Sequence, residues 1–368
     1  MKAIAIQPGV GQPHWVDRTQ PTITAANQVL LRVLRVGICG TDREEILGGR
    51  SKAPEGQKEL VIGHEMLGRV EKVGDQVTRA KPGDLAVFTV RRVCGECLPC
   101  AMNRPDMCLT GKYHERGIWG MDGYQTEYVV DQEQYLVRLA PELADIGVLA
   151  EPMSVAEKAI DEAGRIQAGR LPQASAAPDW WFGRPCLVAG LGPIGLLAAL
   201  ALRVRGAAVY GLDIVPEASA RPQWLLAIGG QYINGQEIPP DKIASLRRSM
   251  DVIIEAAGIA SLSFNLLDAL GANGVMVLTG LPDGDRPIEL NGAALVRGLV
   301  LGNQAIAGSV NAARDHFQLG VDDMLSAELR WPGHVAKLIT HHYAAQDFAT
   351  GFSQHPDDEI KAVIEWAQ

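Results

Sequence analysis

Apolar and polar positions alternate in short runs through the first third of the chain, and Gly and Pro turns separate these runs. The pattern predicts strands at residues 29–36, 68–73 and 84–90, because side chains on a half-buried strand repeat every two residues. The first long helical pattern covers residues 150–168. Short strands without intervening long helices are typical of a β-rich, barrel-like domain.

The pattern of apolar residues changes after residue 184, where predicted apolar strands alternate with predicted helical segments. We interpret residues 171–184, a break that contains Pro and Ala, as a linker between domains. Alternating strands and helices predict a doubly wound parallel sheet, so the fold class is α/β. The predicted strands cover 186–189, 208–213, 251–256 and 274–279, and helical residues cover 194–205, 223–228 and 262–270.

Residues 185–202 carry no charged side chain and approach the length of a bilayer-spanning helix. However, three glycines and a proline interrupt the first half of this stretch. A buried strand, a glycine turn and a buried helix explain it better than a membrane span. The first twelve residues lack the charged-then-apolar layout of a secretion signal, so we expect a cytoplasmic protein without a membrane partner.

The composition agrees with a globular protein of about two domains. Of the 368 residues, 47% are hydrophobic and 21% are charged, which supplies enough apolar material for a sizeable core. The net charge of −9 repels phosphate backbones, so nucleic acid is not an expected partner.

A glycine-rich motif follows the predicted strand at 186–189 and opens an apolar helix. This context is what a dinucleotide-binding G-x-G-x-x-G requires, because the glycines permit a tight turn and close approach of the pyrophosphate. About twenty residues later, Asp213 ends the next strand, where a carboxylate binds ribose hydroxyls and repels a 2′-phosphate. Ile214 and Val215 follow instead of a basic residue, so we predict NAD as the preferred cofactor over NADP. The motif consists of Gly190, Leu191, Gly192, Pro193, Ile194 and Gly195.

Four of the six cysteines lie within fifteen residues, at Cys94, Cys97, Cys100 and Cys108. Two-residue gaps allow a turn to direct successive sulfur atoms at one tetrahedral centre. Because four thiolates fill the coordination sphere of zinc, the predicted site is structural. An iron–sulfur cluster, disulfides or free thiols are the alternative interpretations.

Two shorter motifs hold the residue types of a catalytic zinc site, which needs three protein ligands and one open position. The first contains Cys39, Thr41 and Asp42, and the second contains His64 and Glu65. A His beside a Glu is on its own more often an ordinary surface or core pair.

Together and in this order, the four motifs resemble the zinc-dependent medium-chain dehydrogenase/reductase family, over nearly the whole chain. Residues 39–44, 91–92, 104–108, 110–117, 147–152, 302–304 and 308–311 are most similar to its glucose 1-dehydrogenase branch. The resemblance implies a GroES-like catalytic domain at residues 1–155, to which 306–368 return. It also implies a Rossmann NAD-binding domain at 156–305.

The resemblance implies roles for the polar residues of these motifs. Cys39 and His64 would bind catalytic zinc, with Glu65 and Glu151 able to approach or ligate it, and which of the two does so at rest stays open. Asp42 would orient the ring of His64. Thr41 would form a hydrogen bond with the reacting hydroxyl of the substrate and pass the proton of that hydroxyl on. Glu115, Glu151 and Asn311 would bind hydroxyl groups of the sugar. The nicotinamide side would be lined by Thr279, Leu281, Ser309 and Asn311, with Lys361 near the pyrophosphate.

The implied activity is oxidation of an aldose at C1, with glucose favoured, by hydride transfer to NAD. The product would be an aldono-1,5-lactone, and NADP stays open as a second acceptor. Each chain would hold one catalytic and one structural zinc ion, in a homodimer or homotetramer. Two departures weaken the choice of sugar: Glu44 occupies the position of a relay His, and Val90 that of a polar sugar contact.

Two other interpretations stay open at this point. Another polyol, aldose or alcohol dehydrogenase of the same family would act on galactose, xylose or threonine. Glu115 and Asn311 favour a sugar, because a polar pair discriminates against substrates that leave it unpaired. A non-catalytic zinc module that senses NAD is a different class of protein, and the combined presence of Cys39, Thr41, His64 and Glu151 argues against it.

Overall fold

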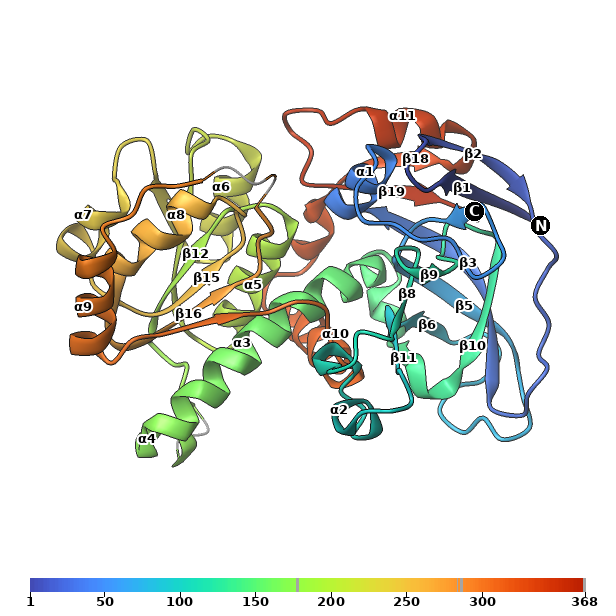
Figure 1. Ribbon diagram of the computed structural model, residues 1–368, viewed down its shortest axis with the longest axis horizontal. Helices are drawn as coiled ribbons and strands as arrows, with labels where there is room; N and C mark the ends of the chain where they lie inside the picture. Colours follow the sequence, from blue (N-terminus) through green and yellow to red (C-terminus); the bar gives the residue numbers. More distant parts are fainter. Residues whose placement is uncertain (177–178, 283, 285–286, 367–368) are drawn as a thin grey trace. The chain divides into compact units, whose positions relative to one another are not determined.

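The computed structural model describes residues 1–176, 179–282, 284 and 287–366, and they form two compact units (Figure 1). The first unit comprises Met1–Ser154, Asn311–Leu325 and Val335–Gln368, and the second comprises Val155–Val310 and Ser326–His334. Residues 171–184, the predicted linker, lie within the sequence range of the second unit, and 177–178 are outside the described residues. The predicted domain boundaries stay a prediction.

The first unit is built on mainly antiparallel sheets, with the parallel pair β18–β19 in the largest sheet and the parallel pair β8–β9 in a smaller one. Its seven-stranded sheet has the order β11-β6-β5-β3-β19-β18, and β10 also pairs with β3. These strands are β3 (Gln28–Ile38), β5 (Glu65–Val73), β6 (Leu85–Phe88), β10 (Tyr128–Gln132), β11 (Leu136–Leu139), β18 (Ile339–Ala344) and β19 (Lys361–Glu365). Two three-stranded sheets contain β1 (Lys2–Gln7), β2 (Gly11–Asp17) and β4 (Leu60–Val61), and β7 (Arg91–Arg92), β8 (His114–Arg116) and β9 (Gly120–Met121).

Alternation of apolar side chains explains why the sheet strands form where they do. Val29, Leu31 and Val33 of β3 point into one core with Phe88 of β6 and with Tyr124. The three strands predicted in the first third of the sequence are confirmed as β3, β5 and β6. Burial of one sheet face thus fixes the register of these strands.

Helices in the first unit are few and mostly short. They are α1 (Gly40–Ile46), α2 (Leu98–Ala101) and α11 (Phe348–Ser353), with short 3-10 helices at Pro105–Met107, Glu133–Tyr135, Pro141–Leu143, Gly147–Leu149, Val335–Leu338 and Ala345–Asp347. Two longer helices, α3 (Ala150–Arg170) and α10 (Arg314–Arg330), each begin in the first unit and end in the second.

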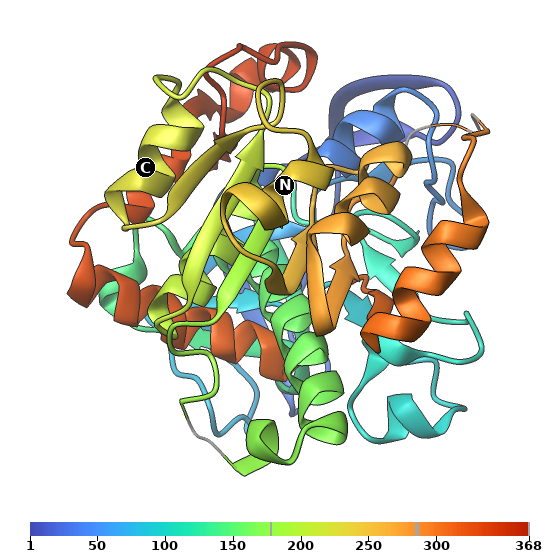
Figure 2. The same cartoon turned by 90° about the vertical axis from the view of Figure 1, so that its left-hand side faces the viewer.

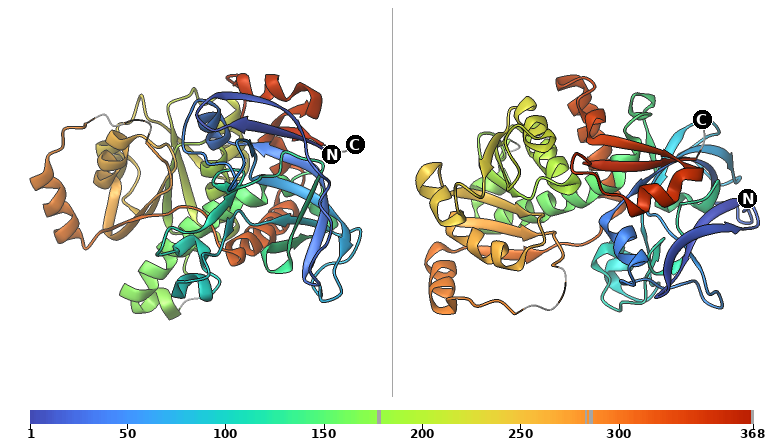
Figure 3. Two further views of the ribbon diagram at one scale, coloured as in Figure 1. Left: turned by 45° about the vertical axis from the view of Figure 1, so that its right-hand side comes forward. Right: turned by 90° about the horizontal axis from the view of Figure 1, so that it is seen from above.

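The C-terminal segment returns to the N-terminal sheet of the first unit. Strand β19 pairs antiparallel with β3, with Ala362 opposite Ile38 and Glu365 opposite Arg35. Figure 3 shows these C-terminal strands in red beside the blue N-terminal ones. This pairing brings Lys361 next to the end of β3, where the first candidate zinc motif begins.

The second unit contains a six-stranded parallel sheet with the order β14-β13-β12-β15-β16-β17. In chain order this is 3-2-1-4-5-6, the arrangement of a dinucleotide-binding doubly wound sheet. The α/β fold class predicted from the sequence is therefore confirmed. The strands are β12 (Pro185–Ala189), β13 (Ala208–Asp213), β14 (Gln231–Asn234), β15 (Met250–Glu255), β16 (Leu270–Leu278) and β17 (Ala305–Gly308).

Helices pack on both faces of this sheet (Figure 2). One face buries Leu187, Leu212 and Ile253 against residues of α7, α8 and α9. Helix α5 packs near Val188, on the opposite side of the same strand. The helices are α4 (Pro172–Ala176), α5 (Pro193–Val204), α6 (Ala220–Ala227), α7 (Pro240–Leu246), α8 (Ala260–Asn265), a 3-10 helix at Leu266–Ala269, and α9 (Gly292–Gly302).

The uncharged stretch at 185–202 forms β12, the glycine turn and most of α5, as predicted. Among the described residues, no helix is both long enough and apolar enough to span a bilayer.

A buried ion-pair network lies within the first unit. Asp131 accepts hydrogen bonds from Arg92 Nη2 and from Arg116 Nη2, both at 2.6 Å, and all three side chains are buried. Arg92 also donates to the hydroxyl of buried Tyr124 at 3.3 Å. Burial would raise the pKa of Asp131, but the two guanidinium groups outweigh it and lower the pKa to about 2.

We expect Asp131→Asn to reduce the free energy of unfolding at neutral pH by about 3 kcal/mol or more, because it leaves two buried cations without their shared anion. Since the pKa of Asp131 is lower in the folded state than its unfolded value of about 3.9, its contribution is complete above about pH 4. It is lost as the pH falls toward about 2. Denaturant unfolding across this pH range measures both effects.

Asp17→Asn is the control, because the Asp17–Lys2 pair is exposed on the same unit. An exposed pair contributes at most about 1 kcal/mol. Equal losses in the two variants would contradict a dominant role for the buried network.

Candidate functional site

Cys39, His64 and Glu65 meet at the end of the strand pair β3–β5. Each offers one ligand atom, and these three atoms lie within 4.8 Å of one another. Strand pairing explains the meeting: Gly37 of β3 lies opposite Glu65 of β5, and Cys39 and His64 stand just beyond the two strand ends. The donor set of thiol, imidazole and carboxylate is one that zinc accepts.

Glycine at position 37 makes this approach possible. A Cβ atom at Gly37 would lie 2.0 Å from a carboxylate oxygen of Glu65 and 3.0 Å from Cε of Lys361. Gly63 precedes His64 with a φ of +90°, a conformation that L side chains rarely adopt. The glycines of both motifs are thus required by the local geometry.

Asp42 orients the cluster. Its Oδ2 accepts a hydrogen bond from the backbone N–H of Cys39 at 2.8 Å, and its Oδ1 lies 3.4 Å from Nδ1 of His64. Burial opposes the charged imidazole, but the charge of Asp42 outweighs burial and raises the pKa of His64 well above its usual value. With Nδ1 turned toward Asp42, Nε2 is the ring nitrogen available to a metal.

Lys361 lies in this cluster. Its buried ammonium donates to Oε1 of Glu65 at 2.6 Å, because β19 pairs with β3 beside β5. The sequence led us to expect Lys361 near a pyrophosphate, whereas its partner in the structure is a carboxylate of the metal cluster. Burial lowers the pKa of Lys361, but Glu65 reverses this and raises it.

Glu151, at the start of α3, is half-buried and does not complete the group of three ligand atoms. Burial raises the pKa of Glu151 to about 7; the charge of His64 opposes this rise and that of Glu65 adds to it. The charge of Glu151 therefore interacts with the charges of His64 and Glu65, although its carboxylate is not one of the three grouped ligand atoms.

A second polar cluster is centred on Glu115 of β8. Its Oε1 accepts hydrogen bonds from Arg91 Nη2 at 2.8 Å and from Asn311 Nδ2 at 3.1 Å. Its Oε2 lies 2.8 Å from Nη2 of Arg50. The structure thus joins Glu115 and Asn311, as the sugar-binding prediction requires, and adds two arginines that sequence reasoning did not assign.

Thr41 and Glu45 lie one turn apart on α1, the helix that Cys39 caps. Thr41 is half-buried, whereas Glu45 is buried. Burial and the charge of Asp42 raise the pKa of Glu45 to about 9. Sequence reasoning missed Glu45, although its i+4 spacing from Thr41 was a signal that the two share a helix face.

The four cysteines of the 94–108 segment form one group, with all four sulfur atoms within 4.8 Å of one another. Sγ of Cys97 lies 3.5 Å from that of Cys94 and 3.9 Å from that of Cys108. Zn–S bonds of about 2.3 Å in a tetrahedron place sulfur atoms about 3.8 Å apart, so the geometry fits zinc. All described cysteines are free thiols, so the disulfide interpretation finds no support in the described residues.

Hydrogen bonds prepare part of this cluster for metal binding. The hydroxyl of Thr110 and the backbone N–H of Glu96 lower the pKa of Cys94 to about 6. Burial instead raises the pKa of Cys100 to about 12. A bound cation would compensate for the second effect, since a coordinating thiol loses its proton.

The glycine loop of the second unit has the geometry that a dinucleotide needs. Gly190 has a φ of +88°, and a Cβ atom at Gly195 would lie 1.8 Å from the carbonyl oxygen of Gly190. Asp213 accepts a hydrogen bond from the backbone N–H of Leu191 at 2.9 Å. The predicted ribose-binding carboxylate therefore sits against the loop, between β12 and β13.

Thr279 and Ser309 follow the carboxyl ends of neighbouring strands β16 and β17. The hydroxyl of Thr279 donates to the carbonyl of Glu255 at 2.8 Å, while the hydroxyl of Ser309 is buried and has no hydrogen-bond partner in the described part of the chain. Leu281 is exposed. Their assignment to the nicotinamide stays a prediction.

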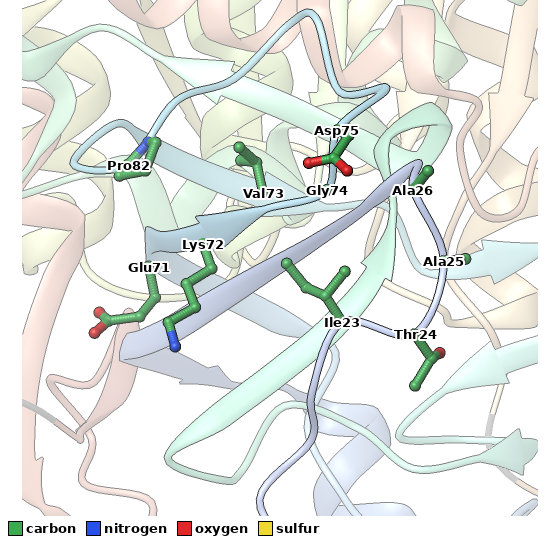
Figure 4. Close-up of a pocket in the computed structure, with 10 residues that line it drawn as sticks. All are labelled: Ile23, Thr24, Ala25, Ala26, Glu71, Lys72, Val73, Gly74, Asp75 and Pro82. Atoms are coloured by element: carbon green, nitrogen blue, oxygen red, sulfur yellow. The ribbon is translucent and has the colours of Figure 1, made fainter.

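A groove of about 490 Å³ lies elsewhere on the first unit (Figure 4). Its lining includes Ile23, Glu71, Lys72 and Pro82. No residue predicted for zinc, sugar or cofactor binding lines this groove, so the clusters described above are the candidate site.

Two family descriptions match this chain. Residues 25–141 match "Alcohol dehydrogenase GroES-like domain", and residues 144–366 match "Glucose dehydrogenase C-terminus". The glucose 1-dehydrogenase of Methanocella arvoryzae is 38% identical over 369 residues, covering 99% of both chains. That of Thermoproteus tenax is 35% identical, again over 99% of both chains.

Solved structures show the same fold. Haloferax mediterranei glucose dehydrogenase in complex with NADP, Zn and gluconolactone has a TM-score of 0.88 and 32% identity, with complete coverage of both chains. Alcohol dehydrogenase from Thermus sp. ATN1, at 21% identity and a TM-score of 0.78, shares the fold over 99% of each chain.

We expect Cys100→Ala to lose one zinc ion per chain and more than about 4 kcal/mol of unfolding free energy, because structural metal binding is coupled to folding. Metal analysis and denaturant unfolding measure the two effects. Cys186→Ala is the matched control, since Cys186 is also buried but lies in β12, outside both clusters. It should keep its zinc and lose only about 1 kcal/mol. Unchanged zinc content in Cys100→Ala would contradict the assignment.

Proposed function

The chain belongs to the glucose dehydrogenase branch of the zinc-dependent medium-chain dehydrogenase/reductase family, and from this premise we propose that it is a zinc- and NAD-dependent glucose 1-dehydrogenase. The aldose would lose a hydride from C1 and a proton from the C1 hydroxyl, giving an aldono-1,5-lactone. The observation that carries the proposal is one unit that contains both the Cys39–His64–Glu65 cluster and the Glu115–Asn311 pair.

The residues of the first cluster fit a zinc ion. Cys39 and His64 Nε2 would hold it, with Asp42 fixing the imidazole through Nδ1. Glu65 would approach the metal when its pair with Lys361 loosens, and Glu151 is the second carboxylate within electrostatic reach of the ligands. A bound zinc supplies Lewis acidity toward the hydroxyl, and nicotinamide supplies the hydride acceptor.

Thr41 would accept a hydrogen bond from the reacting hydroxyl and pass its proton toward solvent. It stands on α1 between Cys39, which caps the helix, and the exposed residue Glu44, which occupies the relay His position. The proton would therefore leave through water rather than through an imidazole. General acid–base assistance of this kind needs the hydroxyl within hydrogen-bond reach of the substrate.

Glu115 and Asn311 would bind hydroxyl groups of the sugar. Arg91 and Arg50 hold the carboxylate of Glu115 in place, so the sugar meets a fixed polar surface rather than a mobile side chain. Preorganised polar groups of this kind select against substrates that cannot pair with them. This favours an aldose over threonine or a simple alcohol, with galactose and xylose as the nearest alternatives.

The four-cysteine cluster would hold a second, structural zinc ion, which gives two ions per chain. Its four thiols leave no position for a substrate. A protein that only senses NAD would need this cluster and the glycine loop, but would not need an open cluster with Thr41 beside it.

We propose NAD as the preferred cofactor because Asp213 faces the loop at Leu191 and is followed by Ile214 and Val215. A carboxylate there would repel a 2′-phosphate. The Haloferax mediterranei relative was solved with NADP, so NADP is the second candidate.

We also propose a homodimer or homotetramer. Strand β17 is the last strand of the six-stranded sheet and carries the partly exposed Ile306. Helix α9, directly before it, exposes Val296, Val300 and Leu301. An edge strand beside apolar side chains favours association between copies.

The test of the activity is reduction of NAD and NADP by a panel of aldoses and alcohols, followed by absorbance, with and without a chelator. We expect chelator-sensitive NAD reduction with glucose. Activity on alcohols or amino alcohols without activity on any sugar would overturn the roles of Glu115 and Asn311.

We expect Asp213→Asn to lower the ratio of kcat/KM for NAD to that for NADP by about tenfold, because it removes the charge but keeps an acceptor for the Leu191 N–H. Steady-state kinetics with both cofactors gives the ratio. Glu237→Gln, an exposed carboxylate of the same unit, is the control. An unchanged ratio in Asp213→Asn would contradict the ribose assignment.

A further inference from the structure

Glu45 is a buried carboxyl group without a partner. Its side chain is 1% exposed, and neither of its oxygen atoms has a hydrogen-bond partner among the described residues. A buried polar group in this condition is unfavourable, and such groups are rare in native proteins. The position therefore needs an explanation beyond packing.

Three other carboxylates near the reaction site are paired. Asp42 binds the Cys39 N–H and lies beside His64. Glu65 pairs with Lys361, and Glu115 pairs with Arg91 and Arg50. Glu45 differs from these three because it forms neither a hydrogen bond nor a described ion pair.

Its place on α1 connects Glu45 to the reacting hydroxyl. Glu45 follows Thr41 by four positions and Asp42 by three, so all three side chains lie on neighbouring positions of one helix face. The carboxyl group is close enough to Asp42 and His64 for their charges to affect its pKa, and Arg50 and Glu115 act on it as well. Glu45 thus shares a helix face with Thr41, the residue proposed to contact the reacting hydroxyl.

We propose that Glu45 is a further substrate-binding residue, whose carboxyl group exchanges a hydrogen bond with a sugar hydroxyl close to the reacting carbon. This inference rests on the proposed aldose dehydrogenase function and names a specificity contact for it. A protonated carboxyl group offers both a donor and an acceptor, which matches the dual character of a hydroxyl. Because both oxygen atoms are buried, the Glu45 side chain would have to turn toward the sugar as it binds, and the sugar would then supply the partner that the carboxyl group lacks.

The opposing explanation is a buried acid that fills space. An apolar side chain of similar length would fill the same space without a polar group to desolvate. Glu45→Leu therefore separates the two explanations, since a space-filling acid gains or keeps stability on this change and loses no activity. Glu45→Gln keeps the hydrogen-bonding capacity and is the conservative variant.

The experiment measures kcat/KM for glucose and for its 2-, 3-, 4- and 6-deoxy analogues in the wild-type chain and both variants. We expect Glu45→Leu to lower kcat/KM for glucose by at least about tenfold relative to the wild type. For the one analogue that lacks the contacted hydroxyl, the substitution should lower kcat/KM by less than about threefold. Glu45→Gln should recover most of the activity. Glu142→Gln, an exposed carboxylate of the same unit, should behave as the wild type.

Two results would overturn the proposal: equal losses with glucose and every analogue, or no loss at all in Glu45→Leu. Thermal unfolding and NAD affinity confirm that the variants are folded, and Glu45→Met, an unbranched apolar side chain of similar length, replaces Glu45→Leu if the Leu variant does not fold. Absence of aldose oxidation in the wild-type chain would instead defeat the proposed function itself. The two failures are therefore distinguishable.

Discussion

The pairing of β19 with β3 is the interaction on which the candidate site depends. It brings Lys361, near the end of the chain, against Glu65. A buried carboxylate beside a metal ligand is costly unless it is paired, and Lys361 supplies the pairing charge. Gly37 leaves the space that both side chains occupy. Segments from the N-terminal and C-terminal parts of the chain thus contribute side chains to one cluster.

The carboxylates around this cluster have different partners, and the partners suggest different roles. Asp42 faces an imidazole, Glu65 faces an ammonium, and Glu115 faces two guanidinium groups. Each charge is fixed before a ligand arrives, so little reorganisation is needed when it does. Glu45 lacks a partner of this kind, which is why its position is informative.

Local features of this structure followed from the sequence. The glycine loop, the spacing of the four cysteines, the apolar pattern of β3 and the continuous apolar run of β12 are set within a few residues, so their geometry could be predicted. The Lys361–Glu65 and Arg50–Glu115 pairs could not be predicted, because they depend on how segments far apart in the sequence meet in the fold. The same holds for Glu45. Its four-residue spacing from Thr41 can be read from the sequence, whereas its burial depends on the fold and could not be predicted.

The most direct test of the account is zinc-dependent recovery of activity. Protein stripped of metal by a chelator is titrated with zinc, and glucose-dependent reduction of NAD is followed together with metal content. We predict no turnover without metal and recovery as zinc binds, whereas Cys39→Ala stays inactive although it binds NAD and keeps the zinc of its four-cysteine cluster. Full turnover by the metal-free chain would contradict the central claim that Cys39 and His64 hold a catalytic zinc.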